Sequence, residues 1–378
     1  MRPLPSKRYI ETLTGLRGVA ILMVLCYHLV LDGYVQQQHG LVGIVRAMMW
    51  TGWAGVDLFF AISGFLITNI LLDTRTRPHY FKSFHFHRIL RIFPLYYLVL
   101  LVIFLAQPLF LAHPALAQIY PTRGGFLAYI FFVQNWWMPI FGQGRFLLGH
   151  FWTLAVEEQF YLLWPLIVWR ARSRYLLQTC IVGAFLCPLV RYIFARHDPT
   201  SMFVYMSTAA RFDTLLFGCA TAIAVRYPIG QQIVGKLAPR LAIASAIGLF
   251  VINAVMRDLF FRGIHTQVLG YTLIAIFSTC VVFYAWQINR TGKFADRLLR
   301  SRFLEIWGRY SYGIYVFHAP FFILTSHYLR HYAWFGVSIW RSALCGLGVA
   351  AVVFTLAALS YEFFESHFLA LKRDYNPG

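Results

Sequence analysis

The chain has 378 residues, of which 59% are hydrophobic and 12% are charged. A soluble domain carries about a quarter charged residues, so this composition excludes an ordinary soluble protein. The net charge of +19 would suit a nucleic-acid partner, but the basic residues fall in short clusters between apolar runs, which argues against a continuous nucleic-acid groove.

The apolar runs predict an all-α bundle of about ten membrane-spanning helices, because each is long enough to cross a bilayer. In chain order the spans are expected near 10–31, 53–72, 92–111, 151–169, 176–195, 207–225, 241–256, 267–286, 309–329 and 338–361. A shorter run at 125–138 is explained better as a re-entrant segment. Basic clusters place both termini in the cytoplasm, and 1–378 forms a single membrane domain. Small residues in the second span predict close helix packing, namely Gly52, Gly55, Ser63 and Gly64.

The first expected span, Tyr9–Leu31, carries two ionisable side chains, Arg17 and His28, which are costly inside hydrocarbon. They are eleven positions apart, close to three turns, so they share one helical face and lie roughly 16 Å apart along the axis. Snorkelling toward the nearest headgroups is the simpler explanation for either residue alone. Their common face favours the alternative, in which both line a polar path into the membrane.

Two carboxylates, Asp57 in the second span and Glu157 in the fourth, are expected at nearly the same depth as His28. In this topology all three lie roughly 5–9 Å below the outer surface. A carboxylate beside an imidazole fixes its tautomer and supports the imidazolium, which is the usual arrangement for general-base catalysis. We therefore expect Asp57 or Glu157 to orient His28. The alternative is that the carboxylates pair with arginines of the bundle, such as Arg17 or Arg211.

At the opposite side of the membrane, Arg88 and Arg91 are three positions apart and share a helical face. Guanidinium groups bind phosphate oxygens bidentately, so this pair predicts a site for an anionic phosphate ligand at the cytoplasmic entrance. Arg17 would continue the positive path from there toward His28. An ordinary basic cluster that contacts lipid phosphates would explain the same spacing.

A second intramembrane histidine, His318, lies two residues before Pro320. Because a proline inside a helix leaves a carbonyl without its N–H donor, we expect His318 to bond a freed carbonyl; a place on the polar cavity is the alternative. The six cysteines all lie in apolar runs and predict neither disulfides nor a metal site.

Five motifs follow one another along nearly the whole chain. The first is a basic residue, ten others and a histidine, at Arg17 and His28. The second is GVDLFFAISGFLI, from Gly55 to Ile67, and the third is Arg-x-x-Arg on Arg88 and Arg91, followed by IFPLYY. Five motifs in order carry far more information than any one of them alone.

The fourth motif, W-T-L-x-x-E-x-Q-F-Y, runs from Trp152 to Tyr161 and contains Glu157, and the fifth is SYGIYVFH, ending at His318. With these five motifs the chain resembles the acyltransferase 3 family of membrane carbohydrate O-acyltransferases. The resemblance implies an integral membrane enzyme that uses cytoplasmic acyl-CoA, commonly acetyl-CoA, as co-substrate. We expect no metal in the site. The acceptor would be a hydroxyl of a glycan, a glycolipid or a related molecule.

The resemblance also implies that the Arg-x-x-Arg pair holds the CoA phosphates and that the motif histidine is catalytic. Some relatives carry an added extracytoplasmic hydrolase-like domain, and this chain resembles the stand-alone form. The expected location is the bacterial cytoplasmic (inner) membrane, where the chain would contact lipids and no nucleic acid.

We therefore expect acyl-CoA to dock on Arg88 and Arg91, with its pantetheine arm along the face marked by Arg17. His28 would take the proton of the acceptor hydroxyl as that hydroxyl attacks the thioester, and an acyl-histidine intermediate stays open. A transporter or flippase for an anionic or glycolipid substrate is the main alternative, and a lipid-binding scaffold is another. The residues do not specify the acceptor, the acyl chain length or the oligomeric state.

Overall fold

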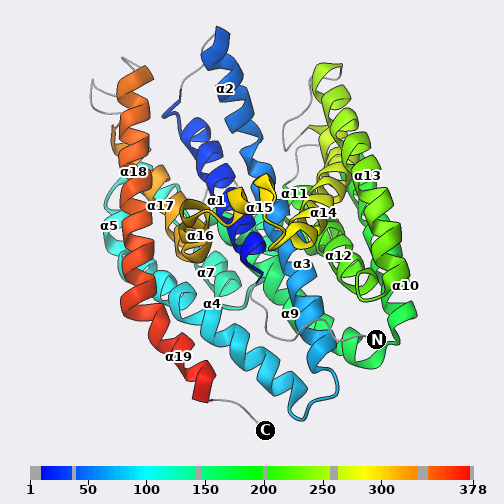
Figure 1. The fold of residues 1–378 in the computed structure, drawn as a ribbon. Helices are drawn as coiled ribbons and strands as arrows, with labels where there is room; N and C mark the ends of the chain where they lie inside the picture. Colours follow the sequence, from blue (N-terminus) through cyan, green and yellow to red (C-terminus); the bar gives the residue numbers. More distant parts are fainter. Residues whose placement is uncertain are drawn as a thin grey trace.

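The structure is a computed structural model that describes residues 10–35, 40–141, 147–198, 202–255, 263–329 and 339–374. In these ranges every regular element is a helix, and the long helices run side by side as a bundle (Figure 1). Seven helical segments are long and apolar enough to cross a membrane: Glu11–Leu31, Gly40–Thr74, Tyr80–Leu105, Ser173–His197, Pro228–Ala254, Thr266–Ile288 and Trp340–Lys372. The chain is therefore an integral membrane protein of the helical type.

Ten helices overlap the ten predicted spans, although two of them begin well before the predicted start, at Tyr80 rather than 92 and at Pro228 rather than 241. They are α1 (Glu11–Leu31), α3 (Gly55–Thr74), α4 (Tyr80–Leu105), α9 (Trp152–Arg170), α10 (Ser173–His197), α12 (Thr208–Ala224), α13 (Pro228–Ala254), α14 (Tyr271–Ile288), α17 (Ser311–Leu329) and α18 (Ile339–Ser360). Three of them, α9, α12 and α17, are not among the seven segments that are long and apolar enough to cross. The number of ten crossings and the cytoplasmic position of both termini stay predictions.

The remaining helices are short. The α-helices among them are α2 (Gly40–Trp50), α5 (Gln107–Leu111), α6 (Pro114–Ala117), α7 (Arg123–Ile130), α8 (Gln134–Phe141), α11 (Phe203–Met206), α15 (Phe294–Leu299), α16 (Arg302–Arg309) and α19 (Ser366–Asp374). There are also two 3-10 turns, η1 (Thr51–Ala54) and η2 (Gly149–Phe151), and two π-helical turns, η3 (Thr266–Gly270) and η4 (Tyr361–Glu365). The run predicted as re-entrant is broken into α7 and α8, neither of which is long enough to cross.

The close packing predicted for the second span is confirmed at its glycines. A Cβ added at Gly64 would lie 2.1 Å from the backbone oxygen of Leu215 on α12, and one added at Gly218 would lie 2.4 Å from that of Ala61 on α3. Two more of the predicted small residues meet backbone atoms of α1 in the same way, Gly52 and Gly55. Only glycine permits such an approach, so these residues set the spacing of the helices around the site.

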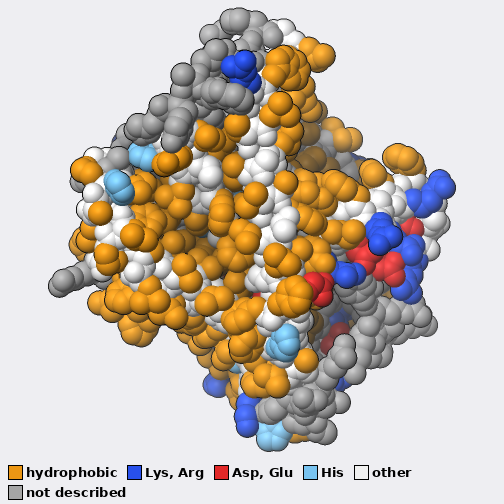
Figure 2. Space-filling view, turned by 90° about the vertical axis from the view of Figure 1, so that its left-hand side faces the viewer, with side chains coloured by type: hydrophobic (Ala, Val, Ile, Leu, Met, Phe, Trp, Pro, Cys, Tyr) orange, Lys and Arg blue, Asp and Glu red, His pale blue; other side chains and the backbone are white. Residues whose placement is uncertain are grey.

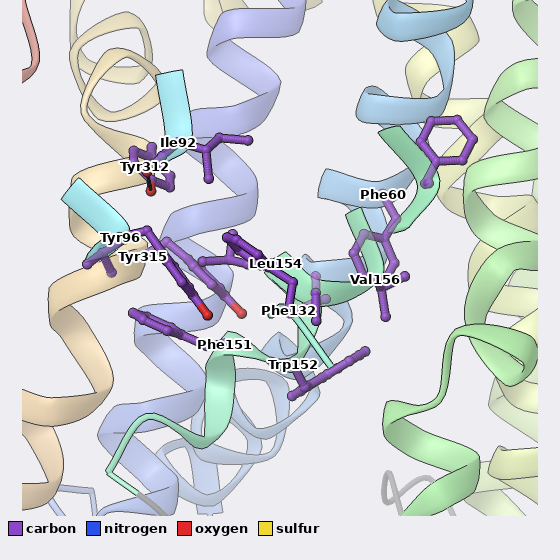
Figure 3. Close-up of a cluster of buried hydrophobic side chains, with 14 of the residues drawn as sticks. Phe60, Ile92, Tyr96, Phe132, Phe151, Trp152, Leu154, Val156, Tyr312 and Tyr315 are labelled. Carbon is purple, nitrogen blue, oxygen red and sulfur yellow. Dashed lines mark hydrogen bonds between the residues drawn. The ribbon is translucent and has the colours of Figure 1, made fainter. Parts of the chain in front are cut away.

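Aromatic side chains fill the core between α3, α4, α9 and α17 (Figure 3). The ring of Tyr96 stacks between Phe132 and Phe151, with centroid distances of 4.3 and 5.1 Å. Phe132 belongs to the turn between α7 and α8, so the broken segment packs into the bundle. The outside is equally apolar: Figure 2 shows one face almost covered by hydrophobic side chains, with charged side chains gathered at its margins. An outer face of this kind suits contact with lipid tails.

Candidate active site

A cavity of about 380 Å³ opens among α1, α3, α4, α9, α17 and α19. The three arginines predicted for the anionic ligand, Arg17, Arg88 and Arg91, all line it, together with Lys372. Among the described residues of this lining, Glu157 is the one carboxylate. Four cations against one carboxylate make the cavity strongly positive, which favours an anionic ligand.

The arginines of this cavity are held by packing rather than by counter-ions. Arg17 donates from Nε to the Ser311 hydroxyl at 3.3 Å, and its guanidinium lies 6.0 Å from the ring centroid of Phe59. The Arg88 guanidinium lies over the ring of Tyr161, and its buried Nε has no hydrogen-bond partner in the described part of the chain. No described carboxylate forms an ion pair with Arg17, Arg88 or Arg91. Their charge is thus available to a ligand.

Glu157 lies in this cavity and not beside His28. Its carboxylate accepts a hydrogen bond of 2.5 Å from the Ser63 hydroxyl on α3. Ser63, expected to serve helix packing, therefore has a polar contact of its own. The prediction that Glu157 shares a chamber with His28 is wrong in geometry, because equal depth on two helices does not make their side chains converge.

Asp57 is also directed away from His28. Both of its carboxylate oxygens accept 2.9 Å hydrogen bonds from Nη2 of Arg211, and Thr214 donates to Oδ1 at 3.0 Å. Asp57 and Arg211 are buried, and the Arg211 guanidinium stacks on Tyr271 with its carbon 4.2 Å from the ring centroid. A buried guanidinium needs a counter-ion, and Asp57 is that counter-ion. The expectation that Asp57 orients His28 is wrong, and its alternative, pairing with Arg211, is what the structure shows.

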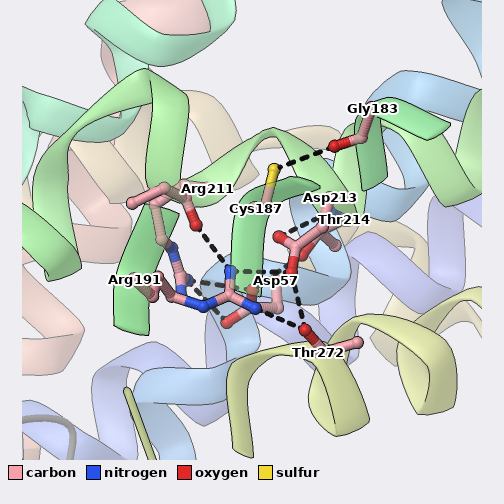
Figure 4. A network of polar contacts seen from close by, with 9 residues as sticks. Asp57, Gly183, Cys187, Arg191, Arg211, Asp213, Thr214 and Thr272 are labelled. Carbon is pink, nitrogen blue, oxygen red and sulfur yellow. Dashed lines mark hydrogen bonds and ion pairs between the residues drawn. The ribbon is translucent and has the colours of Figure 1, made fainter. Parts of the chain in front are cut away.

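The polar contacts of Asp57 belong to a larger buried network between α3, α10, α12 and α14 (Figure 4). Arg191 donates to Asp213 at 2.8 Å and also bonds the hydroxyl of Thr272. Thr272 in turn donates to Asp213 at 3.2 Å. Two ion pairs in one network tie these helices together and leave both carboxylates occupied.

The carboxylate that does contact His28 is Asp32, which the sequence reasoning missed. The Asp32 Oδ2 atom lies 3.0 Å from His28 Nδ1, one helical turn further along the chain. Asp32 is fully buried, whereas the His28 side chain is 12% exposed. A carboxylate accepts, so Nδ1 carries the proton and Nε2 presents a lone pair. The i, i+4 spacing from a motif histidine was the available signal, but Asp32 lies just beyond the predicted first span, which ends at residue 31.

Two further histidines continue from His28 toward the cavity. The ring centroid of His318 lies 4.7 Å from that of His28, and the centroid of His150 lies 4.8 Å from that of His318. The ring of Tyr315 follows at 5.3 Å from His150, and its hydroxyl is 2.6 Å from that of Thr153. Tyr315 and Thr153 line the cavity. We call His28, His318 and His150 the histidine column; it joins the His28–Asp32 pair to the positive cavity.

The tautomers of the column are set by backbone carbonyls. His318 Nδ1 donates to the Tyr315 carbonyl at 2.6 Å, and His150 Nε2 donates to the Val316 carbonyl at 3.3 Å, since a carbonyl can only accept. The Val316 carbonyl is the one freed by Pro320, so His150, rather than His318 as expected, bonds the freed carbonyl. The other ring nitrogens, His318 Nε2 and His150 Nδ1, are buried with no partner in the described ranges.

The column presents unprotonated imidazole nitrogens and the cavity presents cations, so the two ends of the site suit different chemistry. The histidine end can accept protons or hydroxyl hydrogen bonds, and the cavity end can hold anions. No group of three or more His, Cys, Asp or Glu among the described residues has the geometry of a metal site.

The chain matches a family model described as an acyltransferase domain, that of the acyltransferase 3 family, over residues 10–360. It is 28% identical to the peptidoglycan O-acetyltransferase OatA of Listeria monocytogenes, covering 96% of this chain and 56% of the relative. It is 30% identical to the O-acetyltransferase OatA of Staphylococcus aureus, covering 96% and 57%. For the putative peptidoglycan O-acetyltransferase YrhL of Bacillus subtilis the identity is 28%, covering 95% and 54%.

The chain thus spans little more than half the length of these relatives. No solved structure matches it.

Proposed function

This chain belongs to the acyltransferase 3 family, and we propose that it transfers an acyl group, acetyl in the first instance, from cytoplasmic acyl-CoA to a hydroxyl of a glycan. The relatives support the reaction class, because their names describe O-acetyltransferases and two of the names specify peptidoglycan. A peptidoglycan-like carbohydrate or a glycolipid is the proposed acceptor for this chain. Its proposed location is the bacterial cytoplasmic membrane.

The proposed donor fits the residues of the cavity. Acyl-CoA carries a diphosphate and a 3′-phosphate at one end and an uncharged thioester at the other. Arg88 and Arg91 would hold phosphate oxygens, for which guanidinium groups have the matching geometry. The unpartnered Nε of Arg88 is a further donor without a protein acceptor among the described residues. Arg17, on the same helix as His28, would hold the part of the donor that lies between the phosphates and the thioester.

The proposed chemistry centres on the His28–Asp32 pair. His28 Nε2 accepts the proton of the acceptor hydroxyl while the hydroxyl oxygen forms the new C–O bond to the acyl carbon. The C–S bond breaks, and the sulfur leaves as a thiolate that recovers the proton, so the products are an ester and free CoA. Asp32 keeps the proton on Nδ1 and stabilises the imidazolium. General-base assistance of this kind contributes typically ~10²–10⁴-fold.

One observation carries the proposal. The cavity lined by the family arginines reaches Tyr315, and ring contacts continue from Tyr315 through the histidine column to His28, whose Nδ1 is held by a buried carboxylate. A lipid-binding scaffold would have no need of such an arrangement. A transporter could use the charged path, but it would not need an imidazole poised as a base.

The test is release of free CoA by the full chain in lipid nanodiscs supplied with acetyl-CoA. We expect thiol release only when a glycan acceptor, such as a peptidoglycan fragment, is present. His28→Ala should lower the rate by at least ~10²-fold because the base is gone. His113→Ala, at an exposed histidine outside the cavity, is the matched control and should keep the wild-type rate. Acceptor-dependent release that survives in His28→Ala, or no release by the wild type, would refute the proposal, and the latter would favour a transporter.

A further inference from the structure

The cavity has a fourth cation that no family motif contains. Lys372 lies on α19, which begins six residues after the family match ends at residue 360. It nevertheless lines the same cavity as Arg88 and Arg91. We propose that α19 is part of the donor site and that Lys372 binds a phosphate group of the donor. This inference rests on the proposed function and adds a residue that selects phosphorylated donors over uncharged thioesters.

The position of α19 is built into the chain before it. The π-helical turn η4 interrupts the helix between α18 and α19, and such a turn shifts the direction of the residues that follow. The Tyr310 hydroxyl donates to the Glu362 carboxylate at 2.9 Å, and the Ser366 hydroxyl donates to the Glu362 carbonyl at 2.7 Å. After this turn α19 packs against α4, the helix that carries Arg88 and Arg91 (Figure 1).

The charges around Lys372 point to an anion between α4 and α19. Like charges repel by roughly 1 kcal/mol at 4 Å even in water, and more where water is excluded, so a group of cations needs a compensating anion. Lys372 makes no ion pair with a described carboxylate. Of the described carboxylates of this segment, Glu365 accepts a hydrogen bond from Ser360 and Glu362 accepts one from Tyr310, and neither lines the cavity. Among the described residues of the lining, Glu157 is the one carboxylate beside four basic side chains, which leaves a net positive charge for a ligand to compensate.

A phosphate is the ligand group that fits this set. Two arginines offer planar forks and Lys372 offers a compact point charge, a combination suited to a group with several charged oxygens. CoA has such groups, whereas its pantetheine arm has none. Lys372 should thus contribute to the binding of CoA and of adenosine 3′,5′-bisphosphate, but not to the use of S-acetyl-pantetheine.

The experiment measures the affinity of CoA and of adenosine 3′,5′-bisphosphate by calorimetry, with the full chain in nanodiscs. We expect Lys372→Ala to weaken both affinities about 10- to 150-fold, the range of one charge-assisted contact. Lys372→Arg, which keeps the charge, should stay within about threefold of the wild type, since the long cationic arm is preserved. Lys293→Ala removes an exposed cation that does not line the cavity and should change neither affinity. Turnover of S-acetyl-pantetheine should be equal in wild type and Lys372→Ala.

The outcomes separate this inference from the proposed function. Wild-type affinity in Lys372→Ala, or an equal loss in Lys293→Ala, overturns the role of Lys372 and leaves the acyltransferase proposal standing. An equal loss of S-acetyl-pantetheine turnover also overturns it, because it would show a general effect on the fold. A wild type that binds neither CoA nor the bisphosphate removes the donor on which both proposals rest.

Discussion

At the scale of single residues, the role of each buried aspartate in the site depends on the side chain with which it forms a hydrogen bond. Asp32 accepts from the imidazole of His28, whereas Asp57 accepts from the guanidinium of Arg211. Both carboxylates are buried, so burial alone does not distinguish their roles. The partner does: an imidazole held on one nitrogen is ready to act as a base, and a buried guanidinium is a structural charge that must be compensated.

Exchange of each carboxylate for an amide should therefore affect a different property: the rate of acyl transfer for Asp32 and the stability of the fold for Asp57. Asp32→Asn lets the amide N–H donate to Nδ1, which moves the imidazole proton to Nε2 and removes the lone pair that attacks the acceptor proton. We expect kcat for acyl transfer to fall ~10²–10⁴-fold with an unchanged KM for acetyl-CoA. Steady-state kinetics in nanodiscs measure both constants.

Asp57→Asn is the matched comparison. It leaves the buried Arg211 without its counter-ion, which typically costs 3–5 kcal/mol of stability. Its main effect should thus be a lower unfolding midpoint. An Asp32→Asn variant that loses stability but keeps kcat would contradict the assignment of Asp32 as the orienting carboxylate.

At the scale of elements, the site is assembled by the contact between α3 and α12. α3 brings Ser63 to Glu157 in the cavity and Asp57 to Arg211 on α12. Both helices approach through glycine, so their separation is set by backbone atoms and not by side chains that repack. A change at this contact should shift the polar partners as well as the packing.

Gly64→Ala tests the contact directly. Its Cβ would lie 2.1 Å from the Leu215 backbone oxygen, so the helices must separate, and overpacking of this kind typically costs about 1–3 kcal/mol. Gly348→Ala on α18 is the control, because nothing lies within 4 Å of the added Cβ. We expect the thermal unfolding midpoint of Gly64→Ala to lie below that of the wild type. The midpoint of Gly348→Ala should equal that of the wild type. Equal midpoints would show that the α3–α12 contact is not tight.

At the scale of the whole molecule, the sequence predicted more of the cavity than of the histidine end. The motif arginines Arg17, Arg88 and Arg91 line one cavity, as expected, because their spacing along α1 and α4 limits where they can point. Depth in the membrane, by contrast, is only one of the three coordinates that locate a side chain. It placed Asp57 and Glu157 level with His28 but gave no information on the direction of their side chains around each helix axis.

The site residues that the sequence analysis did not identify lie outside the five motifs and outside the predicted spans. Asp32 follows the end of α1, His150 lies in a short turn before α9, and Lys372 lies beyond the family motifs. His150 and Lys372 reach the site only through tertiary packing, which a pattern of spacings along one helix does not contain. Asp32 reaches His28 from the next helical turn, just beyond the predicted end of the first span.

The central claim is that a donor held on the cytoplasmic side reacts with an acceptor reached from the other side through His28. The most direct measurement uses sealed proteoliposomes of uniform orientation, with radiolabelled acetyl-CoA supplied at the cytoplasmic face and the glycan acceptor at the opposite face only. The account predicts labelled acceptor on the far side and free CoA on the near side, both lost in His28→Ala. Label that appears only when donor and acceptor share one side would contradict it.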